Sequence, residues 1–140
     1  MKYKQGKYIP KKPSKYKGDP RNVTYRSSWE YKFMLWCDQT SSVTEWGSEE
    51  IAVPYISPVD NRRHKYYPDF YVKVNNKKYM VEVKPVRQTK EPKIQKKVTK
   101  KYITEVVTYA KNQAKWKAAR EFCKDYGWEF MLITEKELKV

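Results

Sequence analysis

The chain has 140 residues, with 31 Lys and Arg against 16 Asp and Glu, which gives a formal net charge of +15. A chain of this length forms one domain that buries about two-thirds of the surface of its unfolded form. It has no run of 18 apolar residues, and its basic N-terminus lacks a hydrophobic stretch. The sequence therefore predicts neither a membrane span nor a secretory signal.

The positive charge is concentrated in two segments. Residues 1–26 hold nine Lys and Arg with one acid, and residues 84–103 hold eight with one acid, whereas the remainder is balanced. Such concentration is typical of proteins that bind a polyanion. An anionic membrane surface is the alternative, but neither segment has the apolar face of an interfacial helix, so we expect nucleic acid and no membrane.

Residues 1–26 interleave lysines with Tyr3, Tyr8, Tyr16 and three prolines, without a helical or strand period. They are predicted to form an extended basic arm, separate from a domain over 27–140, that becomes ordered on contact with its partner. A solubilising tail is the alternative, and in either case its removal should cost little stability. The candidate DNA contacts in this arm are Lys11, Lys12, Lys15 and Lys17.

A first helix is predicted from Ser27-Ser28 to about Asp38, because apolar residues recur there at helical spacing. Ser27 and Glu30 have the spacing of a capping box, so Glu30 either caps its own helix or serves a functional site. Cys37 lies in this apolar pattern and Cys123 in a later one. We expect both to be reduced core residues rather than a disulfide or a metal site.

Strands are predicted at Val43–Trp46 and Glu49–Ile56, the second an edge or bulged strand because of Pro54. The loop 57–65 carries Arg62, Arg63 and the single histidine, His64. We expect it to lie beside DNA.

The hairpin over residues 66–84 is central to the prediction. Two β-rich runs flank Asn75-Asn76, a dipeptide that tolerates the positive φ of a tight turn. If the loop is those two residues, Asp69 faces Glu82, and Lys84 shares their face of the sheet. Carboxylates roughly 5 Å apart repel each other, but they suit a divalent metal. The alternative is a solvated charged face with a diagonal Asp69–Lys84 ion pair. The opposite face is apolar and is formed by Phe70, Val72, Val81 and Val83.

Pro85 ends the second strand of the hairpin, and residues 86–103 are polar and basic. A helix is predicted from about Thr104 to Asp125, with Gly127 as its stop and a strand at Trp128–Thr134. Its apolar stripe would be Ile103, Val106, Val107, Ala110, Ala114, Ala118 and Phe122. The strand–helix–strand crossover implies a right-handed parallel pair. The predicted class is α/β, with a mixed central sheet flanked by helices. The basic candidates for DNA contacts are Lys96, Lys97, Lys100 and Lys101.

Pro68-Asp69 followed by Glu82-Val83-Lys84 resembles the PD-(D/E)XK nuclease signature, particularly its transposon-type endonuclease branch, in which a first-helix Glu corresponds to Glu30. The resemblance implies a restriction-endonuclease-like fold. It also implies Mg²⁺, for which Mn²⁺ would substitute, held by Asp69, Glu82, the Val83 carbonyl and Glu30. Lys84 would orient the attacking water or stabilise developing charge. Relatives also place a Gln or Lys from the long helix near the site, which leaves Gln113 and Lys115 as alternatives.

Residues 7–85 resemble more specifically the head completion nucleases of contractile-tailed bacteriophages, through the stretches KYIPKKPSKYKGDPRNVTYRSSWEYKFMLWCD, TEWGSEEIAVPYISPVDNRRHKYYPDFYVK and VEVKP. This resemblance implies an endonuclease or end-trimming nuclease that acts on double-stranded DNA after packaging. The expected partners are phage portal or neck proteins, and the expected location is the host cytoplasm during assembly, with retention in the virion head. A catalytically inactive head-completion or DNA-binding protein is the main alternative. A transposase-partner or junction-resolving nuclease is a weaker one, and the oligomeric state is open.

Overall fold

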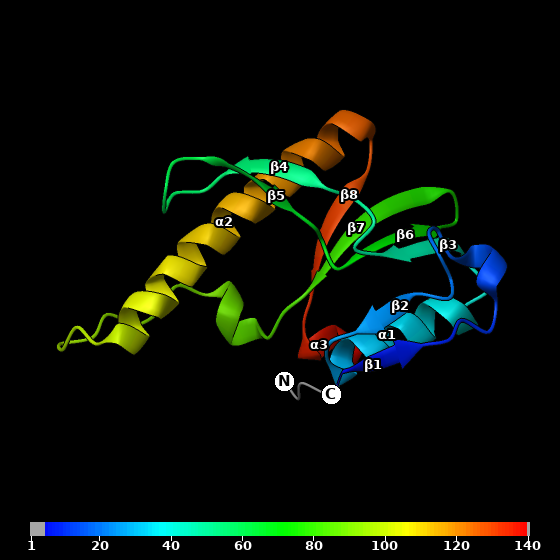
Figure 1. Ribbon diagram of the computed structural model, residues 1–140, viewed down its shortest axis with the longest axis horizontal. Helices are drawn as coiled ribbons and strands as arrows, with labels where there is room; N and C mark the ends of the chain where they lie inside the picture. The colour runs from blue at the N-terminus through cyan, green and yellow to red at the C-terminus, as the bar shows by residue number, and fades with distance from the viewer. Residues whose placement is uncertain (1–4, 140) are drawn as a thin grey trace.

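A computed structural model describes residues 5–139 of the chain, and Figure 1 shows how its elements are arranged. In chain order they are β1 (Gly6–Tyr8), η1 (Pro13–Lys15), β2 (Val23–Tyr25), α1 (Ser28–Gln39), β3 (Val43–Ser48), β4 (Val53–Ile56), β5 (Arg63–Tyr66), β6 (Phe70–Val74), β7 (Lys77–Val83), η2 (Val86–Thr89), α2 (Lys100–Tyr126), β8 (Glu129–Ile133) and α3 (Glu135–Leu138).

A four-stranded mixed sheet in the order β3-β6-β7-β8 is the centre of the fold. The hairpin β6–β7 has the predicted register, with Val74 opposite Lys77 and Phe70 opposite Val81. Asn75 and Asn76 both have positive φ, at 49° and 67°, which the tight turn requires. Strand β3 pairs antiparallel with β6, and β8 pairs parallel with β7 after the α2 crossover. The predicted parallel pair is therefore confirmed.

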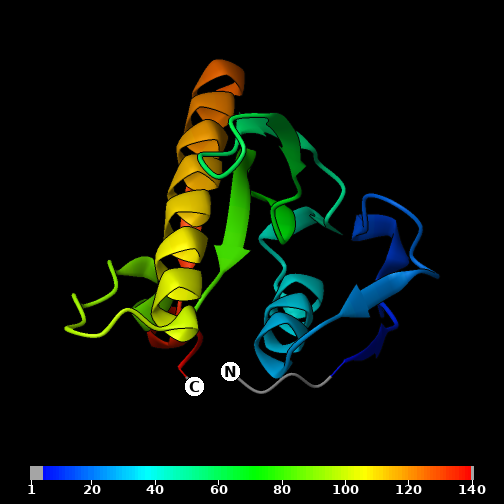
Figure 2. The same cartoon turned by 60° about the vertical axis from the view of Figure 1, so that its left-hand side comes forward.

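Both faces of the sheet are covered. On one face, the apolar side of the hairpin packs with α1, and Phe33 lies 4.7 Å from Phe70 between ring centroids. On the other face, α2 and the hairpin β4–β5 cover Met80 with Trp116 and Tyr66. Figure 2 shows α2 on one side of β7, and α1 with β1 and β2 on the other. The α/β class with a mixed sheet flanked by helices is confirmed.

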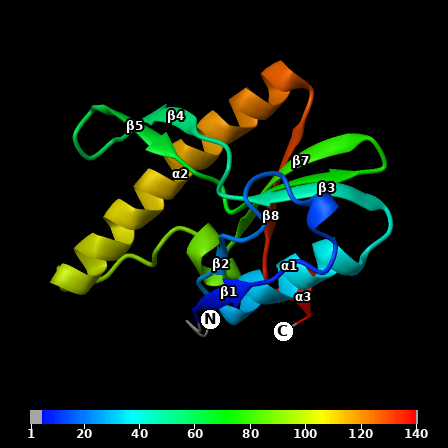
Figure 3. The same cartoon turned by 45° about the vertical axis from the view of Figure 1, so that its right-hand side comes forward.

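The N-terminal segment is part of this packed body. The prediction of an extended arm outside the core is wrong for residues 5–26, because β1 and β2 pair there and the side chains of Tyr8, Tyr16 and Val23 are buried. Tyr8 and Tyr16 pack edge-on against the buried Trp46, with ring centroids 5.8 and 4.8 Å away. Val23 is 1% exposed. Figure 3 shows β1 and β2 running alongside α1. Tyr3 lies outside the described residues.

Polar contacts at the C-terminal end of α1 fix this segment. Asp38 is buried and accepts hydrogen bonds from the Tyr8 hydroxyl (2.8 Å) and from the backbone N–H groups of Lys11 (2.7 Å) and Lys12 (3.1 Å). The Lys15 ammonium donates to three backbone carbonyls at the helix end, those of residues 37, 38 and 40. A cation is favourable there because the last carbonyls of a helix lack intrahelical partners. Lys15 therefore stabilises the fold rather than standing free for DNA.

Several boundaries differ from the predictions. The second strand is shorter than predicted, because only Val53–Ile56 is extended, and the end of the predicted loop, residues 63–65, belongs to β5. Helix α2 begins at Lys100, where the Thr99 side chain caps it, and ends at Gly127, which has φ 73°. Its predicted apolar stripe is wrong in the first half, where Ile103 is 50% exposed, because this part of the helix projects beyond the sheet.

Neither cysteine forms a disulfide. Cys37 and Cys123 are free, buried and in separate core clusters, as predicted. Within residues 5–139, no helix combines the length and apolar character that crossing a membrane requires.

The contacts of Asp38 lead to a stability prediction. We expect Asp38→Ala to lower the free energy of unfolding by about 3 kcal/mol, because it leaves three hydrogen-bond donors without their acceptor. Asp19→Ala, which removes an exposed acid from the same segment, should change it by about 0.5 kcal/mol or less. Urea denaturation of both variants measures the difference. If Asp38→Ala lowered the free energy of unfolding as little as Asp19→Ala does, the contacts of residues 5–26 with Asp38 would add little to the stability of the fold.

Candidate active site

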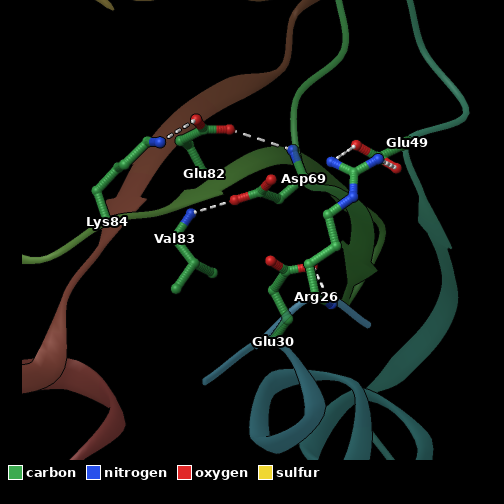
Figure 4. Close-up of polar contacts among 7 residues, drawn as sticks. All are labelled: Arg26, Glu30, Glu49, Asp69, Glu82, Val83 and Lys84. Carbon is green, nitrogen blue, oxygen red and sulfur yellow. Dashed lines mark hydrogen bonds and ion pairs between the residues drawn. The ribbon is translucent and has the colours of Figure 1, made fainter. Parts of the chain in front are cut away.

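The predicted acids come together at one end of the hairpin. Asp69 immediately precedes β6, Glu82 lies near the end of β7, and Lys84 follows that strand. Glu30 enters from the first turn of α1. Figure 4 shows the Asp69 carboxylate between those of Glu82 and Glu30, with Lys84 beside Glu82. The hairpin β6–β7 and the more distant helix α1 therefore supply one site.

Asp69 and Glu82 are tied to each other's strands by hydrogen bonds. The Asp69 backbone N–H donates to Glu82 Oε1 (3.2 Å), and the Val83 backbone N–H donates to Asp69 Oδ2 (2.8 Å). Glu82 is only 5% exposed, so the alternative of a solvated charged face is wrong. The Lys84 ammonium lies 3.9 Å from Glu82 Oε2, and the diagonal ion pair with Asp69 does not form.

Burial leaves these carboxylates poorly solvated. The pKa of Asp69 is raised well above its usual range, first by burial and then by the neighbouring Glu82 charge. Burial also raises the pKa of Glu82, while Lys84 and Lys115 oppose that shift. Two acids that disfavour ionisation in each other's presence form a local excess of negative charge, which a cation can relieve.

Glu30 is only partly a capping residue. Its backbone N–H donates to the Ser27 hydroxyl (3.2 Å), as the predicted cap requires. Its carboxylate, however, accepts the backbone N–H of Arg26 (3.4 Å) and not that of Ser27, so the reciprocal half of a capping box is absent. Burial and the Asp69 charge raise the pKa of Glu30 to about 7. The side chain thus belongs to the electrostatic environment of Asp69.

A further acid, Glu49, was missed by the sequence interpretation, which placed it in a strand. The Arg26 guanidinium forms an ion pair with both carboxylate oxygens of Glu49, at 2.6 and 2.7 Å. The Glu49 backbone N–H donates to the Asp69 carbonyl (3.1 Å), and its φ of 55° is uncommon for a residue other than glycine. Its charge raises the pKa values of both Asp69 and Glu30. No local sequence signal marks this position.

The structure distinguishes the two candidates on the long helix. The charge of Lys115 acts on Glu82, and its ammonium lies over the rings of Tyr55 and Tyr66, at 6.0 and 5.7 Å from their centroids. Burial lowers the pKa of Lys115, while Glu82 raises it. Gln113, two residues away, points along a different direction of the helix surface. Of the two candidates, Lys115 is therefore the one whose charge acts on Glu82.

The predicted DNA-contact residues occupy three separate places. The N-terminal lysines lie beside α1, where Lys17 also pairs with Glu45 (3.5 Å). Arg62 and Arg63 are exposed on the hairpin β4–β5, where His64 pairs with Asp60 (2.8 Å). The last group is exposed around the start of α2, at the opposite end of the molecule from η1, and comprises Lys96, Lys97, Lys100 and Lys101.

The donor set fits a hard divalent cation in its chemistry. Among residues 5–139, no three Asp, Glu, His or Cys side chains converge into a complete ligand set. The hydrogen bonds of Asp69 and Glu82 engage Oδ2 of the former and Oε1 of the latter. Each carboxylate thus has a second oxygen outside these hydrogen bonds, although that of Glu82 also lies 3.9 Å from the Lys84 ammonium. Carboxylate oxygens are the ligands that Mg²⁺ and Ca²⁺ prefer.

The raised pKa of Glu30 gives a pH prediction for the metal-free protein. Between its ordinary value and about 7, the folded state holds a proton that the unfolded state releases, so stability falls as pH rises through this range. The free energy of unfolding of wild type should therefore decrease between pH 4 and pH 8, and this decrease should be about 1–2 kcal/mol smaller in Glu30→Gln. The value allows for the partial exposure of the Glu30 side chain. Urea denaturation with EDTA at both pH values measures it. Glu121→Gln, which replaces an exposed acid of α2 outside the site, is the matched control.

The chain is similar to known endonucleases. Residues 40–135 match the family model of the TnsA-like endonuclease N-terminal domain. The chain is also 34% identical over 139 residues to the head completion nuclease of Enterobacteria phage T4, across 96% of this chain and 93% of that protein. Both matches contain the hairpin with Asp69 and Glu82. The chain therefore belongs to the TnsA-like endonuclease family and is a relative of the phage head completion nuclease.

Proposed function

We propose that this protein is a metal-dependent deoxyribonuclease whose catalytic residues are Asp69, Glu82, Lys84 and Glu30. Its membership of an endonuclease family supports the general activity. The observation that carries the residue assignment is the pair of desolvated acids, tied across β6 and β7, with an ammonium 3.9 Å from one of them. A pair that merely stabilised a fold would not bring two carboxylates together in a poorly solvated place.

The carboxylates of Asp69 and Glu82, with the main-chain carbonyl of Val83, are the proposed ligands of Mg²⁺, and Mn²⁺ should substitute. Bound there, the cation would neutralise the scissile phosphate and lower the pKa of the attacking water. Glu30 lies on the far side of Asp69 and would hold a second ion or orient water. The hydrogen bond from the Val83 N–H fixes the orientation of the Asp69 carboxylate, so this side chain would not need to rearrange when the cation binds.

Two lysines are the proposed cationic groups of the site. Lys84, beside Glu82, is placed to orient the attacking water or to stabilise charge that develops on the phosphate. Lys115 approaches the same acid from α2, at the opposite face of the strand pair from α1. Since an ammonium cannot coordinate Mg²⁺, neither lysine should affect metal affinity strongly.

The proposed biological role rests on the similarity to a phage protein. A head completion nuclease of phage T4 shares almost the full length of this chain, so we propose the same stage of phage assembly, in the host cytoplasm and after DNA packaging. Double-stranded DNA would be the substrate, and portal or neck proteins the neighbours. The exposed cations at both ends of the molecule suit binding to the phosphate backbone, which is sensitive to salt and reads little sequence.

The acids give the main test of activity. We expect Asp69→Asn to reduce Mg²⁺-dependent plasmid cleavage by about 10³-fold or more, because the charge that holds the metal is lost while the acceptor for Val83 is kept. DNA affinity in EDTA should be equal or tighter, since a repulsion toward phosphate is removed. Plasmid nicking and fluorescence anisotropy measure the two properties.

Asp60→Asn, in the exposed ion pair with His64, is the matched control and should cut like wild type. Parallel loss of cleavage and binding in Asp69→Asn would contradict the assignment. Full activity in EDTA would contradict metal dependence, and absence of cleavage in the wild type would favour an inactive head-completion protein.

The two candidates on α2 allow a separate test. Lys115→Met should lower the cleavage rate at saturating DNA by about 10²-fold, because it removes one positive charge from the surroundings of Glu82. Gln113→Met, two residues away, should stay within about threefold of wild type. Quenched-flow or gel-based single-turnover assays measure both rates. A larger loss in Gln113→Met would reverse the assignment.

A further inference from the structure

We infer that the pocket between η2 and the first half of α2 binds an unpaired nucleotide of the strand that is cut. This inference rests on the proposed nuclease function and specifies its substrate. The pocket has a volume of about 510 Å³, within the range of pockets that hold small molecules. Its lining residues are polar or charged on both sides apart from Pro92, and they include two cations and one acid, Glu105. Those that the argument uses are Arg87, Lys90, Thr104, Thr108, Tyr109 and Asn112.

Two elements run from the pocket to the candidate active site, namely the segment from β7 into η2 and helix α2. Arg87 follows Lys84 by three residues, so their Cα atoms are at most about 11 Å apart. Asn112 precedes Lys115 by three residues, which is about 4.5 Å along the helix axis and on the same face. In Figure 2 the turn of η2 lies beside the lower part of α2. A strand whose phosphate reaches the acids would place a neighbouring nucleotide at this pocket.

Helix α2 presents a polar stripe toward the pocket. Thr104, Thr108, Asn112 and Lys115 recur at helical spacing, and the first three line the pocket. Asn112 is only 6% exposed, and within residues 5–139 its amide atoms are not among the fully buried side-chain atoms that lack a partner, so they reach the surface of the pocket that this residue lines. The side-chain hydrogen bonds of α2 within the described residues involve Thr99, Thr104 and Cys123, and not Asn112. This amide has a donor and an acceptor available to a ligand in the pocket.

The chemistry of the lining suits a nucleotide. An Asn amide can donate to and accept from the edge of a base, and a Tyr ring such as that of Tyr109 offers a stacking surface. Arg87 and Lys90 are exposed cations at the mouth, where a backbone phosphate would lie. A base that is paired and stacked in a duplex cannot enter such a pocket, so the nucleotide is unpaired. The substrate inferred is therefore a DNA end or junction with a single-stranded segment next to the cut.

A filled pocket tests the inference in the full-length protein. Thr108→Trp places a bulky ring in the pocket, and it should weaken binding of a duplex with a four-nucleotide overhang about tenfold, while affinity for the blunt duplex stays the same. Val106→Trp is the matched control, because Val106 is an exposed β-branched residue of α2 outside the pocket lining, and it should bind both DNAs like wild type. Fluorescence anisotropy in EDTA measures affinity without cleavage, and thermal melting checks the fold.

A second measurement varies the DNA instead of the protein and uses the same two proteins, wild type and Thr108→Trp. Oligonucleotides with an abasic site at each overhang position in turn should show one or two positions where wild type loses about tenfold in affinity, and Thr108→Trp should lose nothing further there. The inference would be overturned if wild type bound all the abasic oligonucleotides with the same affinity. It would also be overturned if Thr108→Trp and Val106→Trp lost the same affinity for the overhang duplex. Cleavage that survives Asp69→Asn would instead defeat the proposed function, because the binding readout does not depend on catalysis.

Discussion

The structure depends on the register of the hairpin β6–β7. A two-residue turn at Asn75-Asn76 fixes which residues face each other, and the alternation of side chains then assigns each residue to one face of the sheet. A slip by one residue would exchange the acids with the apolar side chains of the core. The same register allows the Asp69 N–H to reach Glu82 and the Val83 N–H to reach Asp69. Fold and site therefore share one constraint.

Burial on both faces of the sheet gives the site its electrostatic character. Helix α2 and the hairpin β4–β5 remove solvent from Glu82, and α1 brings Glu30 toward Asp69. Desolvation raises the pKa values of all three acids, which opposes folding of the metal-free protein above the pH at which they ionise. Such a cost is typical of functional sites, where residues suited to chemistry replace residues suited to stability. The N-terminal segment, away from these acids, fixes the end of α1 through Asp38 and Lys15.

Sequence reasoning succeeded where structure is local. The turn dipeptide, the strand alternation, the Ser27 cap and the Gly127 stop each depend on neighbouring residues, and all were predicted. It failed where contacts are distant. Tyr8 is held by Asp38, thirty residues away, so no periodicity within residues 5–26 could reveal that they are packed.

The same limit applies within the site. Asp69, Glu82 and Lys84 could be grouped from the hairpin alone, and family resemblance added Glu30. The choice between Gln113 and Lys115 required knowing which face of α2 meets β7. Glu49 could not be found, because its place beside Asp69 comes from a backbone conformation that its residue type does not favour.

The most direct test of the central claim is to locate the metal. Crystals of the wild-type protein soaked in Mn²⁺ should give an anomalous-scattering peak in contact with the carboxylates of Asp69 and Glu82, and crystals of Asp69→Asn should lack it. A peak elsewhere, or none between these two acids in a protein that still cuts DNA in the presence of Mn²⁺, would contradict the account.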